Sequence, residues 1–347
     1  MTEFPTHPDA MTPQWLAGIL GALPGTLRGW SSVAVGTGQM CDSYRLTLDW
    51  ADGTAVGPAS VIAKCPSHDP ASRHIAALTG TYVKEVGWYR ELAAHAAVAA
   101  PQCFHAQIAA DDVEFILILS DLAPARQGDQ LAGVGMAALA PCIIEAARLH
   151  AMLWDSPLLD AIGWLRRDNS DLVRALFPQL YAGFRDRYAG RLAPQILAVG
   201  AGLVERLDRW LTRKPAARTI VHGDLRIDNI LFAPDGTRCW LVDWQTLGIG
   251  SGAGDLAYLV GTSIADPAQR DDRAAFDMWI AALRSEGVAS DAATLWTDYR
   301  IGALGGYFMA VFASMNVERT VRGDEMFAVM AERPARQAMA LGSLDLL

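Results

Sequence analysis

Three side chains between residues 219 and 243 have the types and the spacing that phosphoryl transfer from ATP requires. Asp224 and Asn229 lie five positions apart on one segment, and Asp243 follows Asp224 by 19 positions. The reaction needs a carboxylate that orients the acceptor hydroxyl and oxygen ligands that hold Mg²⁺ on the phosphates. Each residue alone could equally be a polar turn residue. The combination, at the spacing of the kinase catalytic loop, favours the chemistry.

The residues around these side chains predict a strand, a loop and a hairpin. Apolar and β-branched residues favour strands at 219–222, 229–233 and 238–243, and the sequence Pro-Asp-Gly at 234–236 favours the turn of the hairpin. Such a hairpin would return Asp243 towards the catalytic loop. The motif therefore has the structural context that its chemistry needs.

This region resembles the aminoglycoside phosphotransferase/choline kinase superfamily, and within it most closely the ecdysteroid-kinase-like branch. The motifs that carry the resemblance are His222-Gly223-Asp224, continued to Asn229, and Val242-Asp243-Trp244-Gln245. The resemblance extends from about residue 30 to 310 and is most specific at 221–260. It implies an α+β, bilobal protein-kinase-like fold, ATP and Mg²⁺ as cofactors, and a small-molecule hydroxyl as phosphate acceptor. It makes Asp224 the catalytic carboxylate, and Asn229 and Asp243 the metal ligands.

The sequence also departs from protein kinases in this region. Gln245 stands where protein kinases have the glycine of the Asp-Phe-Gly motif. No segment resembling the Ala-Pro-Glu motif of the kinase activation segment follows. Both departures argue against a protein substrate.

The resemblance also implies a phosphate-binding lysine and its ion-pair partner. Lys64 ends the predicted strand 60–64 and matches the lysine that contacts the α- and β-phosphates. Glu85, within a predicted helix, is the candidate for its partner. The alternatives are an ordinary surface lysine and a solvated helix face beside Lys84. Both residues lie on the expected elements, which favours the ion pair.

A glycine-containing turn resembles the hairpin that covers the phosphates in this superfamily. Gly36, Thr37 and Gly38 would place backbone N–H groups near the phosphates. A dinucleotide-binding fingerprint is excluded because Cys41 occupies the position of its third glycine, and the sequence has no P-loop lysine motif.

The adenine ring is expected to pair with the backbone that follows the predicted strand 113–119. Ser120 and Leu122 are the candidates, since a hinge segment offers both N–H donors and C=O acceptors. The sequence leaves open which residue makes the contact.

Four further residues have alternative interpretations. Arg226 could stabilise charge on the transferred phosphate, or it could tie the loop to a neighbouring carboxylate. His222 is expected to be buried and hydrogen-bonded to backbone, and His150 to be a satisfied core histidine. Asp255 is expected to brace the catalytic loop from the start of a helix, or to cap that helix.

The hydrophobic pattern predicts a sheet-rich lobe followed by a helical lobe. Residues 30–121 alternate as strands do, with one helix at about 75–98, and helical periodicity prevails after Gly135. The later helices are expected at 136–154, 171–188, 194–211, 271–285, 292–312 and 325–341. The predicted division is an N-terminal extension at 1–29, an N-lobe at 30–119, a hinge at 120–127 and a helical C-lobe at 128–347.

Composition excludes several other classes of protein. The 347 residues are 52% hydrophobic and 19% charged, which excludes wholesale disorder, and no apolar run approaches the length of a membrane span. The net charge of −9 opposes nucleic-acid binding. Five cysteines without a CxxC pair favour neither a disulfide framework nor a zinc site. This cysteine usage fits a reducing cytoplasm. The first ten residues lack the apolar stretch of a secretion signal, so a secreted protein is not expected.

Two rival functions follow from other features. A serine hydrolase is disfavoured because no Gly-x-Ser-x-Gly elbow stands between a strand and a helix. The stronger rival is an inactive kinase-like protein that binds a nucleotide or metabolite. Degenerate kinases usually lose the lysine, aspartate or asparagine positions, and this sequence keeps all of them. Aromatic residues in the helical part suggest a small, partly apolar acceptor, although aromatics at helical spacing more often form the core.

Overall fold

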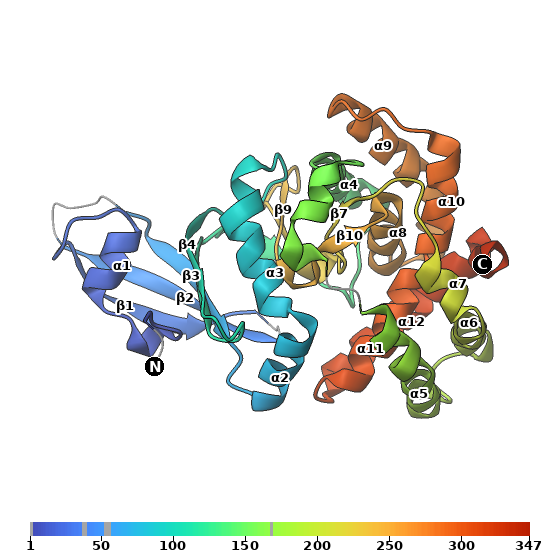
Figure 1. Ribbon diagram of the computed structural model, residues 1–347, viewed down its shortest axis with the longest axis horizontal. Coiled ribbons are helices and arrows are strands. Elements are labelled where there is room, and N and C mark those ends of the chain that lie inside the picture. Colours follow the sequence, from blue (N-terminus) through green and yellow to red (C-terminus); the bar gives the residue numbers. More distant parts are fainter. Residues whose placement is uncertain (1–2, 37–39, 52–56, 167–168) are drawn as a thin grey trace. The chain divides into compact units, whose positions relative to one another are not determined.

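Residues 3–36, 40–51, 57–166 and 169–347 are described by the computed structural model. They divide into two compact units, one built on a β-sheet and the other mostly helical (Figure 1). The first unit comprises Met1–His95, Ala100–Ala123 and Asp243–Gln245, and the second comprises Ala96–Ala99, Pro124–Val242 and Thr246–Leu347. This composition confirms the predicted α+β class. None of the described helices combines the length and the apolar character that crossing a bilayer requires.

The first unit contains a five-stranded antiparallel sheet in the order β1-β2-β3-β5-β4. Its strands are β1 (Leu27–Ala34), β2 (Cys41–Trp50), β3 (Ser60–Pro66), β4 (Cys103–Ile108) and β5 (Phe115–Ser120). β3 and β5 lie inside the sheet, and their apolar runs are almost continuously buried. β2 instead alternates, with Leu46 and Leu48 buried, because one of its faces covers the core. β1 and β2 pair antiparallel, with Ala34 opposite Tyr44.

Strand β4 was not predicted. It is an edge strand with the sequence CFHAQI, and all of its residues are half-buried. A strand that is neither alternating nor continuously apolar gives no periodic signal. Only its pairing with β5 identifies it.

The helices of the first unit are shorter than the pattern predicts. The single helix expected at about 75–98 is divided into α2 (Pro70–Thr79) and α3 (Thr81–Gly87). Gly80, with φ +68°, separates them, since a left-handed residue ends a helix. The chain continues from α3 as one π-helical turn at Trp88–Leu92.

The first 20 residues contribute to the core of the same unit. Helix α1 (Pro13–Ile19) packs against β1, and Leu16 is fully buried. Phe4 and Met11 belong to the same apolar cluster as β2, β3 and β5 residues. The domain boundaries given from the sequence stay a prediction.

The second unit is built from nine described helices and two small antiparallel sheets. The helices are α4 (Met136–Ala151), α5 (Ser170–Tyr188), α6 (Pro194–Glu205), α7 (Leu207–Thr212), α8 (Gly252–Ser263), α9 (Asp272–Ser285), α10 (Ala292–Gly302), α11 (Leu304–Asn316) and α12 (Val321–Leu341). The strands are β6 (Arg126–Gln127), β7 (Thr219–Val221), β8 (Ile230–Phe232), β9 (Cys239–Leu241) and β10 (Gly248–Gly250). Two predicted long helices are broken, at Arg206 and at Ala303.

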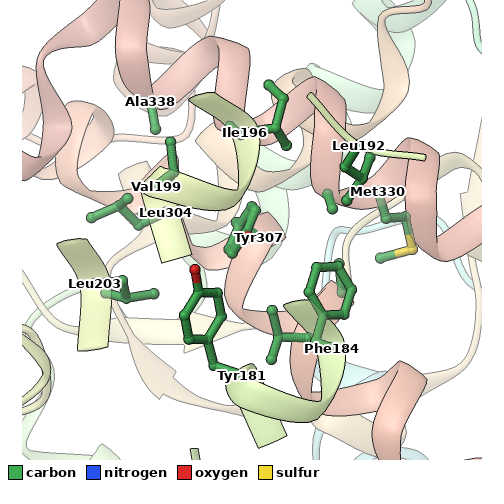
Figure 2. Close-up of a cluster of buried hydrophobic side chains, with 14 of the residues drawn as sticks. Tyr181, Phe184, Leu192, Ile196, Val199, Leu203, Leu304, Tyr307, Met330 and Ala338 are labelled. Atoms are coloured by element: carbon green, nitrogen blue, oxygen red, sulfur yellow. The ribbon is translucent and has the colours of Figure 1, made fainter. Parts of the chain in front are cut away.

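The core of the second unit lies between α5, α6, α11 and α12. Figure 2 shows Tyr181 and Phe184 from α5 facing Val199 from α6 and Tyr307 from α11. Phe184 and Tyr307 are fully buried. This packing explains the helical periodicity of the sequence after residue 135, because these apolar stripes cover one another.

The two small sheets hold the segment that carries the candidate catalytic residues. β8 pairs with β9 and with β6, so the predicted hairpin is present, with Ile230 opposite Leu241. β7 pairs with β10. The loop between β7 and β8 is therefore anchored by a sheet at each end.

Helices α8 and α10 approach so closely that only glycine fits at their contact. A Cβ on Gly302 would overlap the backbone of Gly254. Because the obstacle is backbone, it cannot rotate away. We expect Gly302→Ala to lower the free energy of unfolding by about 3 kcal/mol. The control is Gly163→Ala, whose Cβ would have no atom within 4 Å and which should change stability little. Thermal unfolding of both variants, followed by circular dichroism, checks this; equal melting temperatures would contradict it.

Candidate active site

A buried ion-pair cluster lies in the sheet-containing unit. Lys64 on β3 donates from Nζ to Glu85 Oε1 on α3 at 2.6 Å and to Asp243 Oδ1 at 2.8 Å. Lys64 is 8% exposed and Glu85 is 1% exposed. Burying unpaired charges would be strongly unfavourable, so the ammonium of Lys64 compensates the burial of the two carboxylates, which repel each other. The structure therefore contains the ion pair expected between Lys64 and Glu85, and adds Asp243 to it.

The carboxylates of this cluster keep Lys64 charged. Burial alone would lower the pKa of Lys64, but the nearby carboxylates outweigh it and hold that pKa well above its usual value. Burial raises the pKa of Glu85, opposed by Lys64 and by hydrogen bonds to its carboxylate. The result is an ammonium on strand β3 held between two carboxylates.

Asp243 is held in an uncommon backbone conformation. Its φ is +69°, in the left-handed region that non-glycine residues seldom adopt. The next residue, Trp244, stacks on Trp88 with ring centroids 3.9 Å apart and planes 19° from parallel. Both indoles are fully buried. This stacking anchors the turn that carries Asp243, and such local strain is typical of functional residues.

A second cluster surrounds Asp224 in the helical unit. Its carboxylate accepts a hydrogen bond from Tyr258 at 2.5 Å on Oδ1 and from Asn229 Nδ2 at 2.9 Å on Oδ2. Arg226 Nε lies 3.2 Å from both oxygens. Burial alone would raise the pKa of Asp224, but Arg226 and Tyr258 outweigh it and lower the pKa below its usual value. Asp224 is therefore a fixed, ionised hydrogen-bond acceptor.

The orientation of the Asn229 side chain leaves its oxygen available. Its Nδ2 donates to the backbone and to the side chain of Asp224, both at 2.9 Å. Within the described parts of the chain, Asn229 Oδ1 and Asp243 Oδ2 make no hydrogen bond. An amide oxygen and a carboxylate oxygen are donors that suit Mg²⁺, which takes only one or two protein ligands beside substrate phosphates. Each of the two side chains therefore has an oxygen donor of the kind Mg²⁺ prefers, and a metal shared between them stays a prediction. No cluster of three or more His, Cys, Asp or Glu side chains that could hold a metal occurs in the described ranges.

Arg226 ties the catalytic loop together. Its Nη1 donates to Asp228 Oδ2 at 2.6 Å, while its Nε faces Asp224. Asp228 in turn accepts from the backbone N–H of Gln130 at 2.7 Å. The loop-tying interpretation of Arg226 is thus visible in the structure. Its role towards a phosphate stays a prediction.

Asp255 braces the same loop from helix α8. Its carboxylate accepts from the backbone N–H groups of His222 at 2.8 Å and Gly223 at 3.0 Å, and pairs with His150 Nε2 at 3.2 Å. The alternative that Asp255 caps the helix is wrong, because the capping side chain is Ser251. Gly223 has φ +81°, and a Cβ there would overlap the carbonyl of Thr246, so only glycine fits.

The two histidines are buried, as expected, and each makes hydrogen bonds within the protein. Trp279 Nε1 donates to His150 Nδ1 at 3.0 Å, so the remaining nitrogen carries the proton that faces Asp255. His222 Nε2 lies 3.0 Å from the carbonyl oxygen of Val242. Neither histidine is exposed. Both are positioned to support the loop rather than to exchange protons with a substrate.

The other predicted nucleotide contacts are only partly described. Gly36 has φ +83°, which suits a tight turn, whereas Thr37 and Gly38 lie outside the described residues. The backbone N–H of Ser120 donates to Gln102 O at 2.8 Å and is therefore occupied. The backbone of Leu122 makes no hydrogen bond within the described ranges. Leu122 is thus the better candidate for pairing with a base.

The contacts of Tyr258 with Asp224 and of Gln245 with Glu85 were not predicted from the sequence. Tyr258 lies three positions after Asp255, so both project from one face of α8 towards the loop. That spacing was a readable signal. Gln245 was noted only as a departure from protein kinases, although its side chain contacts Glu85. No periodicity in the sequence indicates that contact.

The sequence matches a known family. Residues 29–293 match the model described as the phosphotransferase enzyme family, APH. This range covers more than half of the chain, so the chain belongs to that family. No curated protein matches the sequence. Membership supports a small-molecule phosphotransferase and does not favour an inactive protein.

Solved structures of similar fold include a choline kinase from Cryptosporidium parvum, with a TM-score of 0.57 and 9% identity over 92% of this chain and 91% of that chain. The GDP complex of aminoglycoside 2'-phosphotransferase-IIIa has a TM-score of 0.55 and 15% identity, covering 88% and 92% of the two chains. ADP-bound aminoglycoside phosphotransferase APH(2'')-Ib has a TM-score of 0.51 and 12% identity, covering 89% and 94%. These likenesses confirm the bilobal protein-kinase-like fold. They do not single out the ecdysteroid-kinase-like branch.

The brace formed by Asp255 predicts a large effect of a small substitution. Asp255→Asn keeps the shape but replaces one acceptor oxygen by a donor facing N–H groups. We expect a loss of about 2–4 kcal/mol in the free energy of unfolding. The matched control is Asp271→Asn at the start of α9, where either residue can cap the helix. Thermal unfolding decides; an Asp255→Asn protein as stable as the control would show that the brace contributes nothing.

Proposed function

We propose that this member of the phosphotransferase enzyme family transfers the γ-phosphate of ATP, with Mg²⁺, to a hydroxyl group of a small molecule. The observation that carries the proposal is the Asp224–Asn229 pair. Asp224 is kept ionised, and Asn229 uses its amide N–H groups on Asp224 while its oxygen stays available. This division of roles is what the hydroxyl-orienting carboxylate and the metal ligand require.

On the nucleotide side, Lys64 would contact the α- and β-phosphates. Glu85 fixes the position of its ammonium, and Asp243 would hold Mg²⁺ together with Asn229. When bound, the metal would neutralise charge on the phosphates during transfer. Positioning is the main contribution expected of these residues, because phosphoryl transfer needs little covalent chemistry from the protein.

The base of the nucleotide would pair with the backbone of Leu122, whose N–H and C=O make no hydrogen bond within the described ranges. Similar folds hold ADP in one solved structure and GDP in another. ATP is the proposed donor, and GTP is the alternative. Turnover measured with each nucleotide separately distinguishes them.

On the acceptor side, Asp224 would accept the proton of the attacking hydroxyl. Arg226 would keep Asp224 in place and could face the transferred phosphate. The guanidinium is already bound to Asp224 and Asp228, so its first effect is on the geometry of the loop. The proposal gives Arg226 a catalytic role only if a phosphate reaches its remaining N–H groups.

The chemical class of the acceptor stays open beyond a small hydroxyl compound. The aromatic residues that suggested an apolar acceptor are largely core residues, including Tyr181, Phe184, Tyr188, Tyr299 and Tyr307. The ecdysteroid-kinase-like branch, which would imply a steroid alcohol, is one arm of the test. We therefore propose a screen of aminoglycosides, amino alcohols, sugars and steroid alcohols with ADP release as the readout. Transfer only to protein serine would contradict the proposal.

Replacement of the two aspartates should separate their roles. Asp224→Asn should leave the Kd of Mg·ATP within about twofold of the wild type while turnover falls by about 10²–10⁴-fold. Asp243→Asn should weaken both, because it removes a metal ligand. Calorimetric titration and turnover with a working acceptor measure this, with Asp235→Asn on the exposed hairpin turn as control. The roles would be wrong if Asp224→Asn abolished binding while Asp243→Asn kept full turnover.

The ion pair predicts a graded loss. Lys64→Ala should lower turnover most, because the phosphates lose their ammonium, and Glu85→Gln should cause a milder loss by letting that ammonium move. Both rates are measured at saturating acceptor, with melting temperatures as the control for folding. Wild-type turnover in both variants would remove this pair from the site.

A further inference from the structure

Gln245 occupies a position from which it reaches the ion-pair cluster. It is 6% exposed, and it lies on the short 3₁₀ turn Trp244–Thr246, two residues after Asp243. Its Nε2 lies 3.2 Å from Glu85 Oε2 and 3.0 Å from the sulfur of Cys41. One amide group therefore serves two buried acceptors.

The contacts of Glu85 are divided between its two oxygens. Oε1 accepts from Lys64 and Oε2 accepts from Gln245. A carboxylate held at one oxygen can rotate about its side chain, whereas one held at both cannot. The amide bond thus fixes the orientation in which Glu85 meets Lys64.

Asp243 and Gln245 act on the pair from the same turn. Asp243 accepts from Lys64, and Gln245 donates to Glu85, so the turn contacts both members of the ion pair. The turn itself is anchored by the stacking of Trp244 on Trp88. A glycine at position 245, as protein kinases have, lacks a side chain and could not donate to Glu85.

We infer that Gln245 is a positioning residue: by fixing the orientation of Glu85, it holds the ammonium of Lys64 where it can bind the phosphates of a nucleotide. This inference rests on the proposed function, because it assumes that Lys64 binds phosphate. It assigns to Gln245 no contact with the substrate. Its effect should therefore appear in the binding of phosphates and be absent from the binding of the nucleoside.

The experiment measures the binding of ADP and of adenosine by calorimetry. We expect Gln245→Met to weaken Mg·ADP binding by about tenfold and to leave adenosine binding unchanged. The loss should persist for ADP in the presence of EDTA, since it acts through Lys64 and not through the metal. Gln245→Glu should lose more than Gln245→Met, because a carboxylate would face Glu85. A packing role predicts the reverse order, since glutamate is closer to glutamine in shape.

Coupling to Glu85 is tested by a double-mutant cycle. In a Glu85→Gln background, Gln245→Met should cause less than about twofold further loss, because the contact is already altered. The matched control is Gln337→Met, another buried glutamine, which donates to Asp272 and Tyr299 instead. It should leave ADP binding unchanged. Where Gln245→Met does not fold, Gln245→Ala replaces it.

The outcomes separate this inference from the proposed function. If the wild type binds neither ADP nor GDP, the proposed function fails and the inference falls with it. If the wild type binds ADP and Gln245→Met binds it equally well, only the inference is wrong. Equal losses for ADP and adenosine, additive losses with Glu85→Gln, or an equal loss in Cys41→Ala would each overturn it as well.

Discussion

Lys64 is an ammonium buried on an inner strand of a sheet, where it is stable only with carboxylates against it. The local sequence cannot supply them, because its strand neighbours are apolar. Glu85 comes from a helix 21 positions later, and Asp243 comes from 179 positions later. This requirement explains why Asp243–Gln245 belongs to the same compact unit as the sheet, although the residues on either side belong to the other unit. Glu85 on α3 and Asp243, which has a left-handed backbone next to the stacked Trp244, are the residues of the first unit that meet this requirement.

In the helical unit, the charge that needs partners is the carboxylate of Asp224. Asp224 is a half-buried carboxylate on a loop, and a loop has few backbone partners of its own. Arg226, Asn229 and Tyr258 supply the hydrogen bonds that keep Asp224 ionised. Asp255 then fixes the backbone before it from the neighbouring helix. These hydrogen bonds restrain the loop, which is what a positioning mechanism needs.

Prediction from the sequence succeeded where a local signal existed. The alternation of β2, the apolar runs of β3 and β5, and the hairpin turn at Pro234 all have a periodicity or a turn residue that can be read directly. The family motif predicts roles for Asp224, Asn229 and Asp243 from their type and spacing, and these roles stay predictions. The features that were not predicted depend on single residues or on contacts between residues distant in the sequence. β4 is identified only by its pairing with β5. A single left-handed glycine, Gly80, separates α2 from α3. The fold brings Gln245 into contact with Glu85, although they lie 160 positions apart in the sequence.

The low basicity of Asp224 is itself informative about the proposed reaction. A carboxylate whose pKa is lowered by Arg226 and Tyr258 is a poor base towards an alcohol in the ground state. It becomes an adequate proton acceptor only when the hydroxyl has begun to bond to phosphorus and has become acidic. In a loose transition state that moment comes late, so orientation of the hydroxyl contributes more than proton abstraction. The hydrogen bonds that lower the pKa of Asp224 also fix its direction, and in such a reaction the gain in orientation outweighs the loss of basicity.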